Sequence, residues 1–292
     1  MKDILKKLRK YEIRIRKAIN AQMQGDFHSV FKGSGLEFDD VRQYAYGDDV
    51  RTIDWNVSAK GHGTFVKTFK EEKEQSVFLI LDVSASQEIG VPGKQKLDIG
   101  KEICALLGIS AIKESSQVGL ICYSDQKEKY VKPGKGIKHS YNITSSIFNL
   151  KPDSTKTNLS QAMKYALEMI KRKSIIILIS DFIDDDYDHH LKALARMHDL
   201  VVIHIADKRE TNMPKLGIIP LYDQESKKTM WVNTSSSTFR KTIESTYGDN
   251  QSKLEDLCKK HQANYTLIKT DEDYVPKLIR LFNVRNRGRK GA

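Results

Sequence analysis

The run VFLILDVSAS, residues 77–86, decides the fold. It begins with five apolar residues in a row, a pattern typical of a strand that is covered on both faces of a sheet. Two later runs, SIIILISD at 174–181 and LVVIHIAD at 200–207, repeat it. Stretches with helical periodicity separate these runs, so the sequence predicts an α/β fold with a doubly wound, mostly parallel sheet.

The same periodicity predicts the other elements of the chain. Helices are expected at 94–115, 138–149, 158–172, 185–198, 235–261 and 272–283, and strands at 117–123, 127–132, 174–180, 200–206, 217–222, 229–233 and 264–269. Four segments follow from this pattern: a basic amphipathic helix at 1–24, a small irregular or β-rich subdomain at 25–74, the α/β domain at 75–285 and a basic tail at 286–292.

The positive charge of the chain is confined to its ends. The formal net charge is +11, but residues 1–20 carry eight basic and two acidic side chains, and residues 277–292 carry six basic and no acidic ones. Each end therefore has a net charge of +6, and the body between them has −1. This distribution argues against a nucleic-acid-binding surface on the body, and it leaves open a contact of the basic ends with a membrane surface.

Cysteine content and hydropathy bear on the compartment. The three cysteines are widely spaced within apolar patterns, which favours reduced thiols in a core over disulfides or a zinc site. The chain has no run of 18 apolar residues and no apolar leader at its start. We therefore expect a cytoplasmic protein.

Polar side chains follow two of the buried strands. Asp82, Ser84 and Ser86 come directly after the first run, Asp181 ends the second, and Thr157 precedes the helix expected at 158–172. Because the carboxyl ends of parallel strands meet at one edge, we expect these side chains to lie close together. Two carboxylates and three hydroxyls suit Mg²⁺ or Mn²⁺, with the remaining positions left to water or an outside ligand.

The string Asp82-Val83-Ser84-Ala85-Ser86, followed by Thr157 and Asp181, resembles the metal-ion-dependent adhesion site of von Willebrand factor A domains. The resemblance covers roughly residues 75–285, and it implies that a carboxylate from a binding partner completes the metal's coordination. The charges agree, because two carboxylates only balance a dication and leave it able to attract an external acid. The resemblance implies binding and not catalysis.

A second resemblance covers the front of the chain. The strings GSGLEF at 33–38, RQY at 42–44, GDDVRTIDW at 47–55 and SA at 58–59 resemble the signature of the bacterial "domain of unknown function 58" family. Members of that family place this signature before a von Willebrand A-like domain and are commonly encoded beside MoxR-type AAA+ ATPases. The resemblance therefore implies a working partnership with such an ATPase.

The signature residues have two interpretations. In one, Arg42, Arg51, Asp48 and Asp54 form a buried or half-buried charge network around Trp55 that fixes this segment. In the other, exposed arginines or Trp55 contact a partner. The residues assigned to this partner-binding or structural signature are Glu37, Arg42, Tyr44, Asp48, Arg51, Asp54 and Trp55.

Other acidic and nucleophilic side chains are set aside. The aspartates at 184–188 lack the spacing of a calcium loop and suit a helix start. Asp153, in the loop before Thr157, is a further carboxylate that could close the metal site. No serine lies in a Gly-x-Ser-x-Gly elbow, so a hydrolase triad is not indicated.

These observations predict a non-enzymatic, metal-dependent protein-binding adaptor. It would act with a MoxR-type AAA+ ATPase in protein maturation or assembly, and the ATPase or a client protein would supply the carboxylate. The alternative is a metal-dependent phosphohydrolase that uses the same Asp, Ser and Thr cluster, although the sequence shows no additional base or nucleophile for it.

Overall fold

The computed structural model describes residues 36–61, 63–71, 76–212, 214–223 and 227–281. They fall into two compact units, one ending at Gln75 and the other beginning at Ser76. The predicted helix at 1–24, the tail at 286–292 and the glycines at 33 and 35 lie outside the described residues. Among the residues that are described, no helix is long and apolar enough to cross a membrane.

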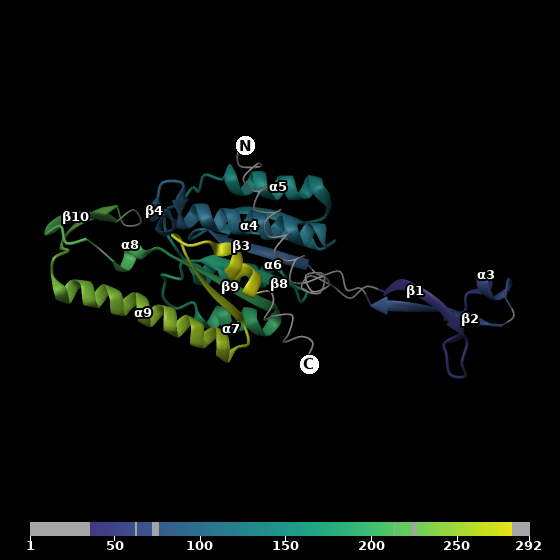
Figure 1. Ribbon diagram of the computed structural model, residues 1–292. Coiled ribbons are helices and arrows are strands. Elements are labelled where there is room, and N and C mark those ends of the chain that lie inside the picture. Colours follow the sequence, from purple (N-terminus) through teal and green to yellow (C-terminus); the bar gives the residue numbers. More distant parts are fainter. Residues whose placement is uncertain (1–35, 62, 72–75, 213, 224–226, 282–292) are drawn as a thin grey trace. The chain divides into compact units, whose positions relative to one another are not determined.

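The larger unit contains a six-stranded sheet with the order β12-β9-β8-β3-β6-β7 (Figure 1). Its strands are β3 (Ser76–Asp82), β6 (Gln117–Tyr123), β7 (Lys127–Gly134), β8 (Ile175–Ser180), β9 (Asp199–Ala206) and β12 (Asn264–Lys269). All neighbours pair in parallel except β6 and β7, which form an antiparallel hairpin at the edge. The predicted doubly wound, mostly parallel sheet is confirmed.

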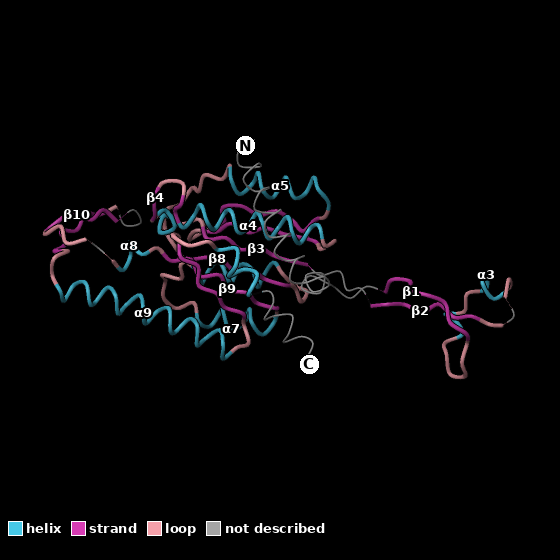
Figure 2. The backbone as a smooth tube through the Cα atoms, in the orientation of Figure 1, coloured by secondary structure: helices cyan, strands magenta, loops and turns pink. Residues whose placement is uncertain are grey.

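Helices cover both faces of this sheet (Figure 2). They are α4 (Lys96–Lys113), α5 (Gly136–Phe148), α6 (Leu159–Met169), α7 (Asp188–Met197) and α9 (Ser237–Lys260), with a further helix over the described residues 274–281. Leu79 and Leu81 of β3 pack in the core beneath α4 and α5, whereas Phe78 and Ile80 pack in the core beneath α6 and α7. The apolar runs are uninterrupted because each residue of the strand enters one core or the other.

Helix α4 lies unusually close to the central strand. A Cβ on Gly100 would lie 3.1 Å from Leu81 Cδ1, and one on Gly108 would lie 3.1 Å from Leu79 Cδ1. Two glycines one above the other thus allow the helix backbone to approach β3. This approach brings the first residue of the helix, Lys96, to the carboxyl end of the sheet.

Several short elements lie at the carboxyl end of the sheet. They are η2 (Ala85–Glu88), the paired strands β4 (Gly90–Val91) and β5 (Lys94–Gln95), helix α8 (Lys208–Thr211), and an antiparallel ribbon of β10 (Ile218–Asp223) and β11 (Lys228–Asn233). The sequence predicts the ribbon but not β4, β5 or α8, which are too short to show a period.

The smaller unit is built on a hairpin of β1 (Leu36–Gln43) and β2 (Phe65–Glu71). Its connection contains η1 (Val50–Thr52) and the single-turn helix α3 (Trp55–Ser58). Among the side chains described in this unit, the buried apolar ones are Val66 and Ile53. The other described side chains of the hairpin are exposed or half-buried.

His204 on β9 makes the stability of the larger unit depend on pH. Burial lowers the pKa of this imidazole from its usual value near 6.5 to about 4. Below pH 6.5 the unfolded chain takes up a proton that the folded protein resists, so stability falls as the pH drops from about 6.5 to 4. We expect this one group to account for a loss of roughly 3 kcal/mol.

Urea denaturation at a series of pH values measures the effect. His204→Gln keeps a polar side chain but does not titrate, so its stability relative to the wild type should rise by roughly 3 kcal/mol as the pH falls from 6.5 to 4. His189 is exposed, so His189→Gln is the matched control and should leave the curve unchanged. Equal slopes for wild type and His204→Gln would contradict the assignment.

Candidate functional site

The candidate site lies at the point where the order of the strands reverses. From β3 the chain proceeds to β6 on one side, and it later returns to β8 on the other side. Loops that leave β3 and β8 therefore diverge and open a crevice at their carboxyl ends, where ligands of such sheets bind. Asp82 ends β3 and Asp181 follows β8 directly.

The turn after β3 folds around the carboxylate of Asp82. Asp82 Oδ1 accepts hydrogen bonds from the Ser84 backbone N–H at 3.0 Å and from Ser84 Oγ at 2.6 Å. Ser84 Oγ also lies 3.0 Å from Ser86 Oγ. Three of the predicted site residues are thus connected, because Ser84 contacts both Asp82 and Ser86.

Asp82 is connected to Asp181 by a serine that sequence reasoning missed. Ser180 Oγ donates to Asp82 Oδ2 at 2.7 Å and also accepts a hydrogen bond from the Phe182 backbone N–H at 3.0 Å. Phe182 has a φ of 54°, in the left-handed region that bulky residues rarely adopt. This turn directs Asp181 toward α4, and strained backbone of this kind is often found at functional sites.

A buried lysine completes the cluster. The Lys96 side chain is fully buried, and its Nζ lies 2.6 Å from Asp181 Oδ2 and in contact with Glu210 Oε1 on α8. Burial opposes the charged form of this ammonium, but the two carboxylates outweigh burial and raise the pKa of Lys96 above its usual value. The lysine is therefore a permanent cation of the site.

The sequence carried a signal for the missed residues. Asp207 ends the third apolar run just as Asp82 and Asp181 end the first two, and it starts a capping box in which Asp207 N–H donates to Glu210 Oε2 at 3.0 Å. The strand-end rule, by which polar residues at the carboxyl ends of parallel strands meet at one edge of the sheet, identifies this turn when it is applied to the third run. For Lys96, the signal is a cation in the first turn of a helix, where the helix dipole disfavours it.

The loop that carries Thr157 lies next to the Asp-x-Ser-x-Ser turn. The Ala85 backbone N–H donates to the carbonyl of Thr155 at 3.0 Å, which places Thr157 two residues from this contact. Glu128 on β7 anchors the start of the loop, since its Oε2 accepts from the Asp153 backbone N–H at 2.8 Å. All five predicted ligand residues thus belong to segments that meet at the carboxyl end of the sheet.

The donor set fits a hard dication. A Mg²⁺–oxygen bond of 2.1 Å gives about 3.0 Å between neighbouring ligands of an octahedron, and the hydroxyls of Ser84 and Ser86 have this spacing. The three carboxylates of Asp82, Asp181 and Glu210 with one ammonium leave a charge of −2, which a dication would balance. In the described part of the chain, no group of three or more His, Cys, Asp or Glu is arranged as ligands, so any metal here would depend on the hydroxyls.

The pKa of Asp82 shows the electrostatic cost of the cluster without a second cation. Burial and, next, the nearby charge of Asp181 raise this pKa from 3.8 to about 6. The bonds from Ser84 and Ser180 only partly offset that cost. A cation beside Asp82 would favour its ionised form.

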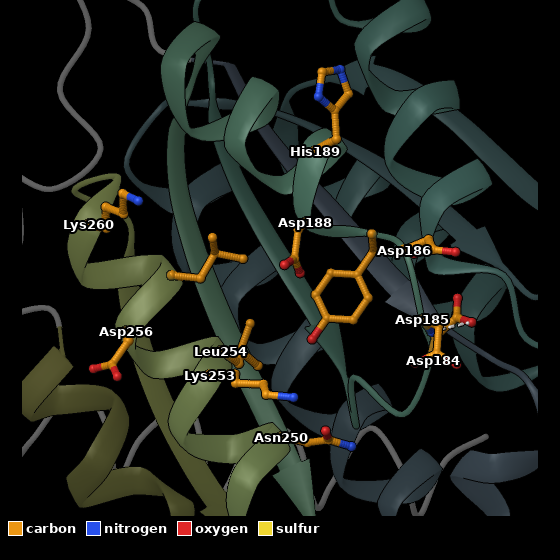
Figure 3. A pocket seen from close by; sticks show the side chains of 12 residues that line it. Asp184, Asp185, Asp186, Asp188, His189, Asn250, Lys253, Leu254, Asp256 and Lys260 are labelled. Carbon is orange, nitrogen blue, oxygen red and sulfur yellow. Dashed lines mark hydrogen bonds between the residues drawn. The ribbon is translucent and has the colours of Figure 1, made fainter.

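A hollow with a volume of about 610 Å³ lies between the loop after β8 and helix α9 (Figure 3). Aspartates from 184–188 line one wall, and Lys253 and Lys260 line the other. Asp184 caps α6, because its Oδ2 accepts from the Leu159 backbone N–H at 2.7 Å. Asp188 lies in the first turn of α7, as expected for an acidic helix start, but the N-cap of α7 is Tyr187, whose side chain makes no capping hydrogen bond.

The predicted charge network around Trp55 is wrong. In the smaller unit Arg42 forms a bidentate pair with Asp48 at 2.6 and 2.8 Å, whose hydrogen bonds lower the pKa of Asp48. Asp54 instead caps α3 by accepting from Asn56 N–H and Val57 N–H. Trp55 is 68% exposed, so neither the Arg42–Asp48 pair nor Asp54 encloses it.

The remaining signature residues lie on the surface or outside the description. Tyr44 and Arg51 are exposed, and nothing is described of the Glu37 side chain, which belongs to β1. Asp48 and Asp54 of the signature therefore accept hydrogen bonds within turns, and Tyr44 and Trp55 are exposed. This division agrees with the second interpretation, in which exposed side chains contact a partner.

Removing the buried ammonium should destabilise the larger unit. Lys96→Met leaves Asp181 and Glu210 buried without their cation, a change that typically costs 3–5 kcal/mol. Adding Glu210→Gln to Lys96→Met removes one of the two unpaired charges, so the double variant should recover part of the loss. Thermal and urea denaturation followed by circular dichroism measure both effects.

The matched control is Lys101→Met on the same helix, where the side chain is partly exposed. It should change stability by no more than about 0.5 kcal/mol. If Lys96→Met were as stable as Lys101→Met, the ion pair would not be a stabilising contact.

Comparisons with solved structures give only distant similarity. The VWA domain of SpRpn10 is 11% identical with a TM-score of 0.37, covering 70% of this chain and 93% of that one. Proximal thread matrix protein 1 from the mussel byssus is 19% identical with a TM-score of 0.38, covering 46% of this chain and only 38% of that one. The fold assignment therefore rests on the order of the strands in the sheet and not on these similarities.

Comparisons of sequence are more informative. The uncharacterized protein Rv1480 of Mycobacterium tuberculosis is 25% identical over 222 residues, 75% of this chain and 70% of that protein. The uncharacterized protein MAV169 of Mycobacterium avium is 22% identical over 138 residues, 47% of this chain and 81% of that protein. The family described as "Protein of unknown function DUF58" matches residues 40–253, which include part of the signature, the Asp-x-Ser-x-Ser turn and Asp181. The chain therefore belongs to the DUF58 family.

Proposed function

We propose that this protein is a non-enzymatic, metal-dependent binding adaptor. Asp82, Ser84, Ser86, Thr157 and Asp181 would hold Mg²⁺ or Mn²⁺ at the carboxyl end of the sheet. When bound, the metal supplies a positive centre that attracts a carboxylate from another protein. The observation that carries the proposal is the buried Asp82 carboxylate with two serine hydroxyls 3.0 Å apart beside it.

The protein's own residues would prepare the site for this role. Ser180 and the Ser84 backbone N–H fix the orientation of Asp82, and Lys96 holds one oxygen of Asp181. Because Lys96 offsets the charge of Glu210, the remaining two carboxylates balance a dication. A neutral cluster with hydroxyl ligands leaves the metal able to accept an external acid.

The proposed partner is a MoxR-type AAA+ ATPase, or a client protein delivered to it, during protein maturation or assembly. The basis for this partner is membership of the DUF58 family together with the genetic association that the family resemblance implies. An adaptor role agrees with the surface of the smaller unit, where Trp55 and Tyr44 are exposed.

Magnesium should bind the isolated protein and stabilise it. At a free Mg²⁺ concentration 100 times the Kd, the stabilisation is about 2.7 kcal/mol. Asp82→Asn removes one ligand charge, so it should abolish the Mg²⁺-dependent rise in Tm. Calorimetric titration and thermal denaturation with Mg²⁺ or EDTA measure binding and stability in parallel.

Asp185→Asn is the control for the loss of one negative charge, because Asp185 is exposed and lies four residues beyond Asp181. It should retain the response to Mg²⁺. An unchanged Tm of the wild type between EDTA and saturating Mg²⁺, with no heat of binding, would refute the metal site.

Binding to the ATPase should depend on the same metal. With a MoxR-type AAA+ ATPase from the same organism, we expect a complex in Mg²⁺ that is lost in EDTA and in Asp82→Ala, because the bridging carboxylate then has no cation to bind. Asp185→Ala should bind like the wild type. A complex that survives both EDTA and Asp82→Ala would exclude a metal-bridged interface.

A further inference from the structure

The β10–β11 ribbon has one face that is exposed along its whole length. Cross-strand pairing places Ile218, Pro220 and Tyr222 on the same face as Asn233, Trp231 and Thr229. All six of these residues are exposed, and Ile218, Tyr222 and Trp231 are 66%, 61% and 72% accessible. We call these six residues the outer face. On the opposite face, Ile219, Leu221 and Val232 are half-buried.

An apolar outer face on a two-stranded ribbon suggests that another molecule covers it. An isolated ribbon is at best marginally stable in water, and contiguous exposed apolar surface of this kind marks interaction sites. Tyr and Trp are also the side chains that most often contribute strongly to protein interfaces. Since Pro220 offers no N–H, β10 is a poor template for strand addition, and contact through the face is favoured.

The ribbon lies at the same end of the unit as the candidate metal site. It follows α8, whose Glu210 contacts Lys96 and whose Arg209 donates to the Gly90 carbonyl of β4 at 2.6 Å. Figure 1 shows β10 beyond α8, on the side of the unit where β4 lies. Six residues lie between Thr211 and Ile218, so the base of the ribbon is within about 25 Å of α8.

A partner that reaches the metal site can therefore contact the ribbon as well. We infer that the outer face of the β10–β11 ribbon is the apolar half of a two-part docking surface for a partner protein, whose Asp or Glu binds at the metal site. The partner would present exposed aliphatic or aromatic side chains that pack against Trp231, Tyr222 and Ile218. This inference rests on the proposed function.

A second copy of this chain does not meet the same requirements. The six residues of the outer face include no Asp or Glu, so a facing ribbon has no carboxylate for the metal. In addition, the described ends of the ribbon carry the exposed lysines Lys215, Lys227 and Lys228, which would repel their copies. Both features favour a different protein with acidic and apolar side chains.

The test measures binding of a MoxR-type AAA+ ATPase from the same organism to the full chain at saturating Mg²⁺. Ile218→Ser combined with Trp231→Ser alters the outer face without touching the metal site. We expect this double variant to bind Mg²⁺ like the wild type and to lose roughly tenfold or more in affinity for the ATPase. Met230→Ser is the matched control, since Met230 is exposed on the opposite face, and its affinity should be unchanged.

The possible results are distinguishable. Wild-type affinity in the double variant, with binding still lost in Asp82→Ala, would overturn the ribbon inference and leave the proposed function standing. If the wild type binds Mg²⁺ but no ATPase, the proposed partner fails and the inference fails with it. Self-association in analytical ultracentrifugation that the double variant abolishes would assign the face to a second copy and overturn the inference.

Discussion

The ion pair between Lys96 and Asp181 is the contact on which the carboxyl end of the sheet depends. A fully buried ammonium is costly to desolvate, and it is tolerated only where carboxylates surround it. Asp181 and Glu210 meet this need from opposite sides, and they come from the loop after β8 and from α8. One cation therefore holds together three segments that are far apart in the sequence.

This pair also determines what the remainder of the cluster can do. Lys96 engages one oxygen of Asp181. The turn after β3 presents a second, separate group of oxygens around Asp82. The two groups are linked through Ser180, which donates to Asp82. The site thus holds one internal cation, the Lys96 ammonium, in a fixed position. The negative charge around the neighbouring Asp82 favours the binding of a second cation.

Much of the fold follows from the sequence because each buried strand is a continuous apolar run ending in a polar residue. The strand-end rule brings Asp82 and Asp181 together, and the alternation of the Asp-x-Ser-x-Ser turn adds Ser84 and Ser86. Lys96 was missed because its direction depends on how closely α4 packs on β3, which periodicity does not show. The enclosed setting expected for Trp55 was wrong because Asp54 caps its own short helix and Asp48 pairs with Arg42, so neither forms a network around the indole.

The close packing of α4 on β3 has a consequence for the chemistry of the site. A Cβ on Gly100 would lie only 3.1 Å from Leu81 Cδ1, so a larger residue there would either displace the Leu81 side chain by a few tenths of an ångström or move the helix away from the strand. Such a movement would lengthen the contact between the ammonium and its carboxylates, because Lys96 stands one turn earlier on the same helix. The electrostatic balance of the crevice is therefore set partly by a residue that has no side chain and no charge.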